Sequence, residues 1–106
     1  MSTVLVILCT CPDREVASRL ASRLVEERLA ACVNVLPEIR SIYRWEGAVS
    51  EDAEVLLVIK TMEARYGELE AWLEENHPYD VPEIVALPAA GVSAGYLAWL
   101  ETATTE

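Results

Sequence analysis

The side chains best suited to chemistry lie in a short polar segment, residues 77–83, which contains the only histidine of the chain. Its two prolines fix φ and restrict the residues that precede them, so this segment is a stiff connector that holds its polar side chains in place. An imidazole at His77, with oxygen donors from Tyr79, Asp80 or Glu83, could bind a divalent metal ion. The alternative is a capped histidine with a structural role.

A second candidate is Lys60, the only lysine of the chain, which lies at the end of the apolar run 54–61. A cation at this position could bind a small anionic ligand, or it could pair with Glu83 and hold an interface together. The structural alternative is a side chain that lies along apolar surface and keeps its charge in water.

Aromatic side chains offer a further way to hold a ligand, because their flat rings can stack on it. Trp45 and Tyr79 are the candidates for this role. At periodic positions, however, aromatic residues such as Trp45, Trp72 and Trp99 are more typical of a core.

The three cysteines differ in their candidate roles. Cys32 follows two alanines in a stretch of strand composition, where a cysteine usually behaves as a small buried hydrophobe. As a thiolate it could instead be a soft ligand for copper(I) or another thiophilic metal. Cys9 and Cys11 alternate on one face of a predicted strand, which matches no zinc-binding spacing, so neither is predicted as a ligand.

The sequence gives little support for catalysis or for nucleotide binding. Cys32 could act as a nucleophile with His77 as its base, but no glycine-rich oxyanion loop and no orienting partner accompany them. Neither the P-loop nor the dinucleotide-binding fingerprint occurs. We therefore predict no catalytic residue.

Composition and charge narrow the class of protein. With 106 residues, of which 53% are hydrophobic, residues 1–106 are expected to form a single domain. The formal charge of −10 argues against nucleic-acid binding and favours attraction of cations, or serves solubility alone. An odd number of cysteines without a secretory signal predicts reduced thiols in the cytoplasm, and no apolar run is long enough to span a membrane.

The period of the apolar residues predicts four strands and three helices. The strands cover residues 3–9, 31–45, 49–61 and 84–87. Pro12 and Asp13 open the first helix, residues 62–76 form the second, and Ser93 caps a short third helix. Pro37 kinks the second strand, which places this strand at an edge or a bulge of the sheet.

The order of these elements is β-α-β-β-α-β followed by a helix, which predicts an α+β ferredoxin-like sandwich with a four-stranded antiparallel sheet. Both crossovers carry their helices to the same face, so the other face is left bare. The second and third strands turn at Glu46 and Gly47 into a hairpin longer than the sheet needs. Oligomerisation is the simplest way to bury the bare face and the hairpin.

Several motifs span nearly the whole chain. They are Cys11-Pro12-Asp13, Leu24-Val25-Glu26, Leu29-Ala30-Ala31-Cys32-Val33-Asn34, Tyr43-Arg44-Trp45-Glu46-Gly47, Ile59-Lys60-Thr61, residues 77–84 and Tyr96-Leu97-Ala98-Trp99. In order and spacing they resemble the CutA divalent-cation tolerance family. The resemblance implies a homotrimer, structurally similar to the PII signalling proteins and linked to tolerance of copper and other divalent metals. Glu38 stands where this family usually has glycine, so the bend there is not expected to use a glycine-only backbone conformation.

The resemblance to PII proteins implies a ligand site in a cleft between subunits. The predicted metal ligands, contributed by neighbouring chains, are Cys32, His77 and Glu83, with copper or another divalent ion as the bound metal. The residues predicted to bind a small ligand are Lys60, Tyr79 and Trp45. We therefore expect a metal-responsive binding protein without turnover. Two alternatives stay open: a PII-like signalling trimer that binds a small anionic metabolite at Lys60, and a trimeric scaffold for a partner protein.

Overall fold

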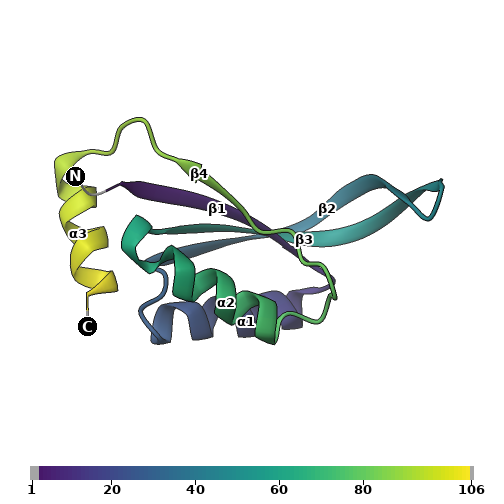
Figure 1. Cartoon of the computed structure of the whole chain (residues 1–106), viewed down its shortest axis with the longest axis horizontal. Coiled ribbons are helices and arrows are strands. Elements are labelled where there is room, and N and C mark those ends of the chain that lie inside the picture. Colours follow the sequence, from purple (N-terminus) through teal and green to yellow (C-terminus); the bar gives the residue numbers. More distant parts are fainter. Residues whose placement is uncertain (1–2, 106) are drawn as a thin grey trace.

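The structure is a computed structural model that describes residues 3–105 (Figure 1). Its elements are β1 (Val4–Cys11), α1 (Arg14–Glu26), β2 (Cys32–Trp45), β3 (Ala48–Met62), the short 3₁₀ helix η1 (Glu63–Arg65), α2 (Tyr66–Asn76), β4 (Val85–Pro88) and α3 (Ala94–Thr104). The predicted order of strands and helices is confirmed. The predicted second helix begins as η1 before it continues as α2.

The four strands form one antiparallel sheet in the order β2-β3-β1-β4. Helices α1 and α2 lie on the same side of this sheet, α3 lies near the end of the sheet where β1 begins, and the β2–β3 hairpin projects from the opposite end (Figure 1). This is the predicted ferredoxin-like arrangement, in which each βαβ half carries its helix to one face.

The helix ends follow local sequence chemistry. At the start of α1 the Asp13 side chain accepts a hydrogen bond of 2.9 Å from the Val16 amide, which is the expected N-cap. His77 ends α2, as predicted, and leaves the helix in an extended conformation. Ser93 is the N-cap residue of α3, as predicted, but its side chain makes no capping hydrogen bond.

Side chains alternate along β1 and β3, and one set points at α1 and α2. We call this side of the sheet the helix face. Its fully buried residues are Ile7, Cys9, Cys11, Leu57 and Ile59, packed against Leu20, Leu24, Leu69 and Leu73 of the helices. Burial of each large aliphatic side chain contributes about 1.5–3 kcal/mol, so this face holds the main core.

The other set of side chains forms the open face, which α1 and α2 leave uncovered and which α3 covers only at one end, where Leu100 packs with Val4 and Met62. It carries exposed apolar side chains at Leu36, Val85 and Leu87, the last of them 48% exposed. The predicted bare face is therefore confirmed. Such a surface is typical of an interface, since monomers seldom leave a contiguous apolar patch in water.

A bulge interrupts the pairing of β2 with β3. Leu36 pairs with Leu56 and the next pair is Ile39 with Glu54, so β2 contains one more residue than β3 across this step. Glu38 within the bulge has a φ of 51°, in the left-handed region that favours glycine. The prediction that the bend avoids such a conformation is wrong, and a non-glycine residue adopts it here.

The extra residue changes which β2 side chains share a face with β3. Before the bulge Asn34 and Leu36 lie on the open face, and beyond it Tyr43 and Trp45 lie on the same face as Glu54. A two-residue turn with positive φ at Glu46 and Gly47 closes the hairpin. The bulge thus directs two aromatic rings of the projecting hairpin toward one side.

The C-terminal helix packs on a smaller apolar cluster at the end of the sheet opposite the hairpin. Leu100 of α3 is fully buried there with Val4, Ala31 and Met62. The guanidinium of Arg28 donates a hydrogen bond of 3.3 Å to the carbonyl of Ala103, near the end of α3. These contacts fix α3 against the body of the molecule.

Candidate metal centre

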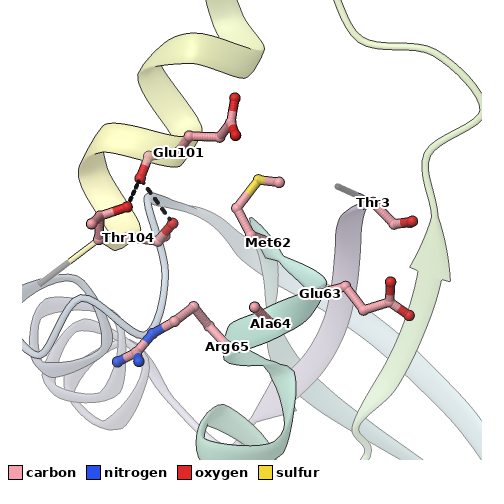
Figure 2. Close-up of a pocket in the computed structure, with 8 residues that line it drawn as sticks. Thr3, Met62, Glu63, Ala64, Arg65, Glu101 and Thr104 are labelled. Atoms are coloured by element: carbon pink, nitrogen blue, oxygen red, sulfur yellow. Dashed lines mark hydrogen bonds between the residues drawn. The ribbon is translucent and has the colours of Figure 1, made fainter. Parts of the chain in front are cut away.

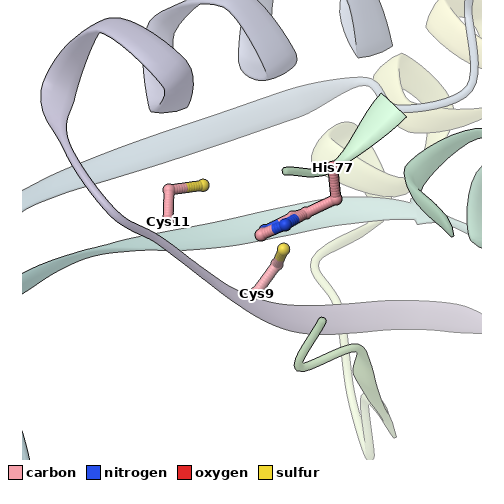
Figure 3. Close-up of side chains that lie close together, drawn as sticks. All are labelled: Cys9, Cys11 and His77. Carbon is pink, nitrogen blue, oxygen red and sulfur yellow. The ribbon is translucent and has the colours of Figure 1, made fainter. Parts of the chain in front are cut away.

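Three side chains that suit a soft metal ion meet on the helix face, where β1 ends (Figure 3). Cys9 and Cys11 come from β1 and His77 comes from the end of α2. Their sulfur and ring-nitrogen atoms all lie within 4.8 Å of one another, and all three residues are buried. Within residues 3–105 this is the one such group of three or more potential ligands. We call it the thiol–imidazole cluster.

Both ring nitrogens of His77 already have partners. Nε2 lies 2.8 Å from the carbonyl oxygen of Thr10, and Nδ1 lies 3.1 Å from the amide nitrogen of Tyr79. A carbonyl can only accept and an amide N–H can only donate, so the proton of the neutral ring is on Nε2. Burial lowers the pKa of His77 below its ordinary value of 6.5, which keeps the ring neutral at pH 7.

The two thiols are coupled to each other. A hydrogen bond with Cys11, together with burial, raises the pKa of Cys9 far above its ordinary value, so Cys9 is a neutral thiol at pH 7. The same hydrogen bond lowers the pKa of Cys11, so the pair gives up its first proton more readily than its second. A bound cation would favour both thiolates.

A groove of about 780 Å³ lies between the projecting β2–β3 hairpin and the connector, residues 77–83. Aromatic and apolar side chains line part of it, among them Tyr43, Trp45, Tyr79 and Val81. The described lining also includes the carboxylates of Asp52, Glu54, Asp80 and Glu83, and no lysine or arginine. We call it the acidic groove. Its charge favours cations over anions.

Tyrosine hydroxyls hold two of these carboxylates in place. The Tyr79 hydroxyl donates a hydrogen bond of 2.7 Å to Glu54 Oε2, and the Tyr43 hydroxyl donates one to Asp52. Burial and the bond to Glu54 raise the pKa of Tyr79, so its hydroxyl stays protonated over the physiological range. Tyr79 therefore contacts both the acidic groove and, through its amide, the thiol–imidazole cluster.

The three predicted metal ligands lie in three different places within one chain. Cys32 begins β2 on the open face and is half-buried, whereas His77 lies in the thiol–imidazole cluster. Glu83 is exposed and lines the acidic groove. A single chain does not bring these side chains together, and a site shared between chains stays a prediction.

Two of the three residues predicted to bind a small ligand do lie together. Trp45 and Tyr79 both line the acidic groove, but Lys60 does not. Lys60 pairs with Cys32 across the ladder, and its ammonium group donates a hydrogen bond to the side-chain oxygen of Asn34. The structure therefore places Lys60 apart from Trp45 and Tyr79, the other two residues predicted to bind the ligand.

The expectation that the tryptophans belong to the core is correct for one of them. Trp72 packs against the main core, whereas Trp45 is 59% exposed and Trp99 is 46% exposed beside Tyr96. The sequence period shows that these residues share a face, but it does not show whether anything covers that face.

The spacing of Cys9 and Cys11 does not predict that they lie beside His77. Zinc motifs on loops have two intervening residues between ligands, a spacing that this pair lacks. On a strand, residues two apart lie on the same face, so Cys9 and Cys11 point the same way by geometry alone. The additional signal was His77 at the end of the helix that covers this face.

A second, smaller hollow of about 410 Å³ lies between η1 and the end of α3 (Figure 2). None of the predicted site residues lines it. Thr104 and Thr105 bond back to the Glu101 carbonyl, and the Arg65 guanidinium donates to the Arg28 carbonyl at 3.1 Å and contacts Glu68. These polar groups serve the local structure.

Fold and site together define a class: a small ferredoxin-like α+β protein with soft-metal donors inside its core and an apolar open face. None of the helices within residues 3–105 has the length and apolar character needed to cross a bilayer. The comparisons with known proteins narrow this class to one family.

The profile described as CutA1 divalent ion tolerance protein matches residues 5–103, so the chain belongs to the CutA1 family. It is 52% identical over 99 residues to the divalent-cation tolerance protein CutA of Thermus thermophilus, covering 93% of this chain and 96% of that protein. The crystal structure of CutA1 from Oryza sativa aligns with a TM-score of 0.95 at 47% identity, covering 98% of this chain and 95% of that one.

The relatives differ in length and in the location that their names give. A CutA protein of Oryza sativa, named chloroplastic, is 48% identical over 96% of this chain, which spans 58% of that protein. The chain spans 55% of the chloroplastic CutA of Arabidopsis thaliana. A structure from Archaeoglobus fulgidus, 32% identical, with a TM-score of 0.92 and covering 99% of this chain and 100% of that one, is named a periplasmic divalent cation tolerance protein.

Proposed function

We propose that this chain is a metal-responsive binding protein of the divalent-cation tolerance type, which holds copper or another thiophilic ion without turnover. The observation that carries the proposal is the thiol–imidazole cluster, where Cys9, Cys11 and His77 converge within 4.8 Å. Family membership supports it, because the family and its Thermus thermophilus member are named for tolerance of divalent ions.

The donor set decides which ions fit. Two thiolates and an imidazole suit copper(I) or zinc, whereas magnesium and calcium prefer oxygen ligands. The bound ion would be held by Cys9, Cys11 and His77 as cargo. Because thiol protons must leave when the ion binds, affinity should rise with pH.

Binding without turnover is supported by the positions of the candidate nucleophile and base. Cys32 lies on the open face, and His77 lies on the helix face with both ring nitrogens bonded to backbone groups. A general base needs a free lone pair within reach of the nucleophile, and this pair of residues lacks that geometry in one chain.

We further propose that the working form is a homotrimer, in keeping with the resemblance of the sequence. The exposed Leu36, Val85 and Leu87 and the projecting hairpin support an assembly that covers the open face. A cytoplasmic location stays our prediction, supported by free thiols at all three cysteines.

The alternative of a PII-like trimer that binds an anionic metabolite rests on Lys60. Its ammonium group already bonds to Asn34, and the groove that holds Tyr79 and Trp45 is lined by carboxylates. An anion would be repelled there. A site between chains at Lys60, or a scaffold role, would need residues from a neighbouring copy, so metal binding is the function that the geometry of one chain supports best.

Metal titration with two cysteine variants tests the proposal. We would titrate copper(I) and zinc into the reduced protein by calorimetry with a competing chelator, comparing the parent with Cys9→Ser and Cys32→Ser. The parent should bind one ion per chain. Cys9→Ser should weaken binding by at least about tenfold, because a soft ligand is lost, while Cys32→Ser should match the parent.

Other outcomes would contradict the proposal in different ways. Loss of binding in Cys32→Ser with a normal Cys9→Ser would favour the site predicted from sequence between chains. Weak binding at many sites, unchanged in both variants, would mean that the metal is only a counterion of an acidic surface.

A further inference from the structure

A metal ion that binds His77 must break a hydrogen bond that the imidazole ring makes in the structure. In the structure Nε2 carries the proton and donates to the Thr10 carbonyl, and Nδ1 accepts from the Tyr79 amide. A neutral imidazole binds a metal only through its unprotonated nitrogen. That nitrogen is Nδ1, and the N–H of Tyr79 occupies its lone pair.

The other route to coordination disturbs the same contact. If the ion binds Nε2, the ring proton must move to Nδ1, and Nδ1–H then faces the N–H of Tyr79, so two donors oppose each other. Whichever nitrogen of His77 binds the ion, the Tyr79 amide therefore loses its hydrogen bond. Metal binding must shift the connector at Tyr79.

Tyr79 carries this shift to a second site. Its hydroxyl donates to Glu54 Oε2 at 2.7 Å, and its ring lies 4.8 Å from the His77 ring, centroid to centroid, with a tilt of 50°. Both Tyr79 and Glu54 line the acidic groove together with Trp45 of the hairpin. One residue thus contacts the buried cluster with its amide and the groove with its hydroxyl.

We infer that Tyr79 is a positioning residue that holds His77 in its Nε2-protonated tautomer and couples occupancy of the thiol–imidazole cluster to the shape of the acidic groove. The inference rests on the proposed function. The Tyr79–Glu54 hydrogen bond favours the connector position in which the Tyr79 amide bonds to His77 Nδ1, so it opposes metal binding. By linkage, metal binding weakens that bond and releases the connector at the groove.

Removal of the Tyr79 hydroxyl alone tests the coupling between the thiol–imidazole cluster and the acidic groove. Tyr79→Phe should bind zinc about three- to tenfold more tightly than the parent, because a hydrogen bond that opposes binding is gone. Tyr66→Phe is the matched control, since the Tyr66 hydroxyl makes a similar bond of 2.8 Å to Glu70 away from the cluster. It should bind as the parent does.

Two spectroscopic readouts examine the mechanism itself. Nitrogen-15 NMR of the metal-free protein should show the His77 proton on Nε2, and zinc should speed hydrogen exchange at the Tyr79 amide. Fluorescence of Trp45, in a variant with Trp72→Phe and Trp99→Phe, should change in proportion to bound zinc.

The outcomes separate this inference from the proposed function. If the parent binds no zinc at the cluster, both fail. If the parent binds zinc but Tyr79→Phe has unchanged or lower affinity, or the Tyr79 amide keeps its protection, the cluster stands and the coupling is wrong. A metal-free ring protonated on Nδ1 would also overturn the inference, because its premise is the Nε2 proton.

Discussion

The two faces of the sheet use the same strands for different purposes. On the helix face, Leu57 and Cys9 are fully buried and both ring nitrogens of His77 have partners within the chain. On the open face, Leu36 of β2 and Leu87 of β4, at the two edges of the sheet, stay exposed. One face is complete in a single chain, whereas the other is complete only when something covers it.

This difference suggests where each kind of function can reside. A site that depends on fixed geometry, such as the thiol–imidazole cluster, benefits from a core that is already packed and dry. A site on the open face, such as that around Lys60 and Cys32, would take its final shape from a neighbouring copy. The four predictions that follow vary one face at a time, from the largest expected effect to the smallest.

Adjacent leucines on β3 give the sharpest test of the comparison. Leu57 is fully buried on the helix face, and Leu56 is half-buried on the open face. Leu57→Ala should lower the free energy of unfolding by about 2–5 kcal/mol, independent of protein concentration, because it leaves a cavity in the core. Leu56→Ala should cost less at low concentration, and its cost should grow when assembly covers the open face. If urea unfolding showed the same loss of unfolding free energy for both variants at every protein concentration, the two faces would not differ as proposed.

Leu87→Glu tests whether the open face is an interface. The side chain is 48% exposed on the edge strand β4, so a single chain should tolerate the charge. In an assembly, Glu would replace apolar burial worth about 1.5–3 kcal/mol per chain with a buried charge. Sedimentation velocity should show a trimer for the parent and smaller species for the variant. A monomeric parent would contradict the proposed trimer directly.

His77 gives a pH-dependent test of the helix face, with metal removed by a chelator. Burial lowers its pKa in the folded protein below the ordinary 6.5, so the unfolded chain binds more protons between these two values. This contribution to stability is complete above about pH 6.5 and is lost as the pH falls through that value towards the folded pKa.

The matched variant is His77→Leu, whose side chain cannot donate a hydrogen bond. Near pH 7.5 it should be about 1–3 kcal/mol less stable than the parent, because the buried Thr10 carbonyl loses its donor. Because only the parent has this histidine, the difference in the free energy of unfolding should narrow as the pH falls below 6.5. Urea unfolding at pH 7.5, 6.5 and 5.5 measures it. A constant difference would mean that His77 titrates alike in both states.

Much of the fold was predictable because its signals are local. The N-cap at Asp13, the end of α2 at His77 and the kink at Pro37 all depend on the chemistry of nearby residues, and each lies where the sequence places it. The bare face followed from the order of the strands and helices, since both crossovers share a hand.

The site was less predictable because it depends on tertiary contacts. The meeting of His77 with Cys9 joins residues 68 positions apart, and no spacing rule describes it. The face on which Trp45 lies was also hidden, because one extra residue in the bulge at Glu38 decides it. A one-residue change of register sends every later side chain to the opposite face.

That bulge gives the last and smallest prediction. Glu38 has a φ of 51°, a conformation that costs a side-chain-bearing residue about 1–2 kcal/mol, whereas glycine adopts it without that penalty. Glycine also makes the unfolded chain more flexible, so Glu38→Gly should raise the free energy of unfolding by only about 0.5–1 kcal/mol. Val49→Gly, in the same hairpin but in an ordinary strand position, is the control and should be destabilising.

The bulge at Glu38 also determines on which face of the sheet Trp45 lies. If Glu38→Gly keeps the bulge, the fluorescence of Trp45 in the variant with Trp72→Phe and Trp99→Phe should be unchanged while stability rises. If stability falls and the fluorescence shifts, the bulge and the register of β2 against β3 require glutamate at position 38. The division into helix face and open face would then depend on Glu38 itself, and the acidic groove would change along with the hairpin.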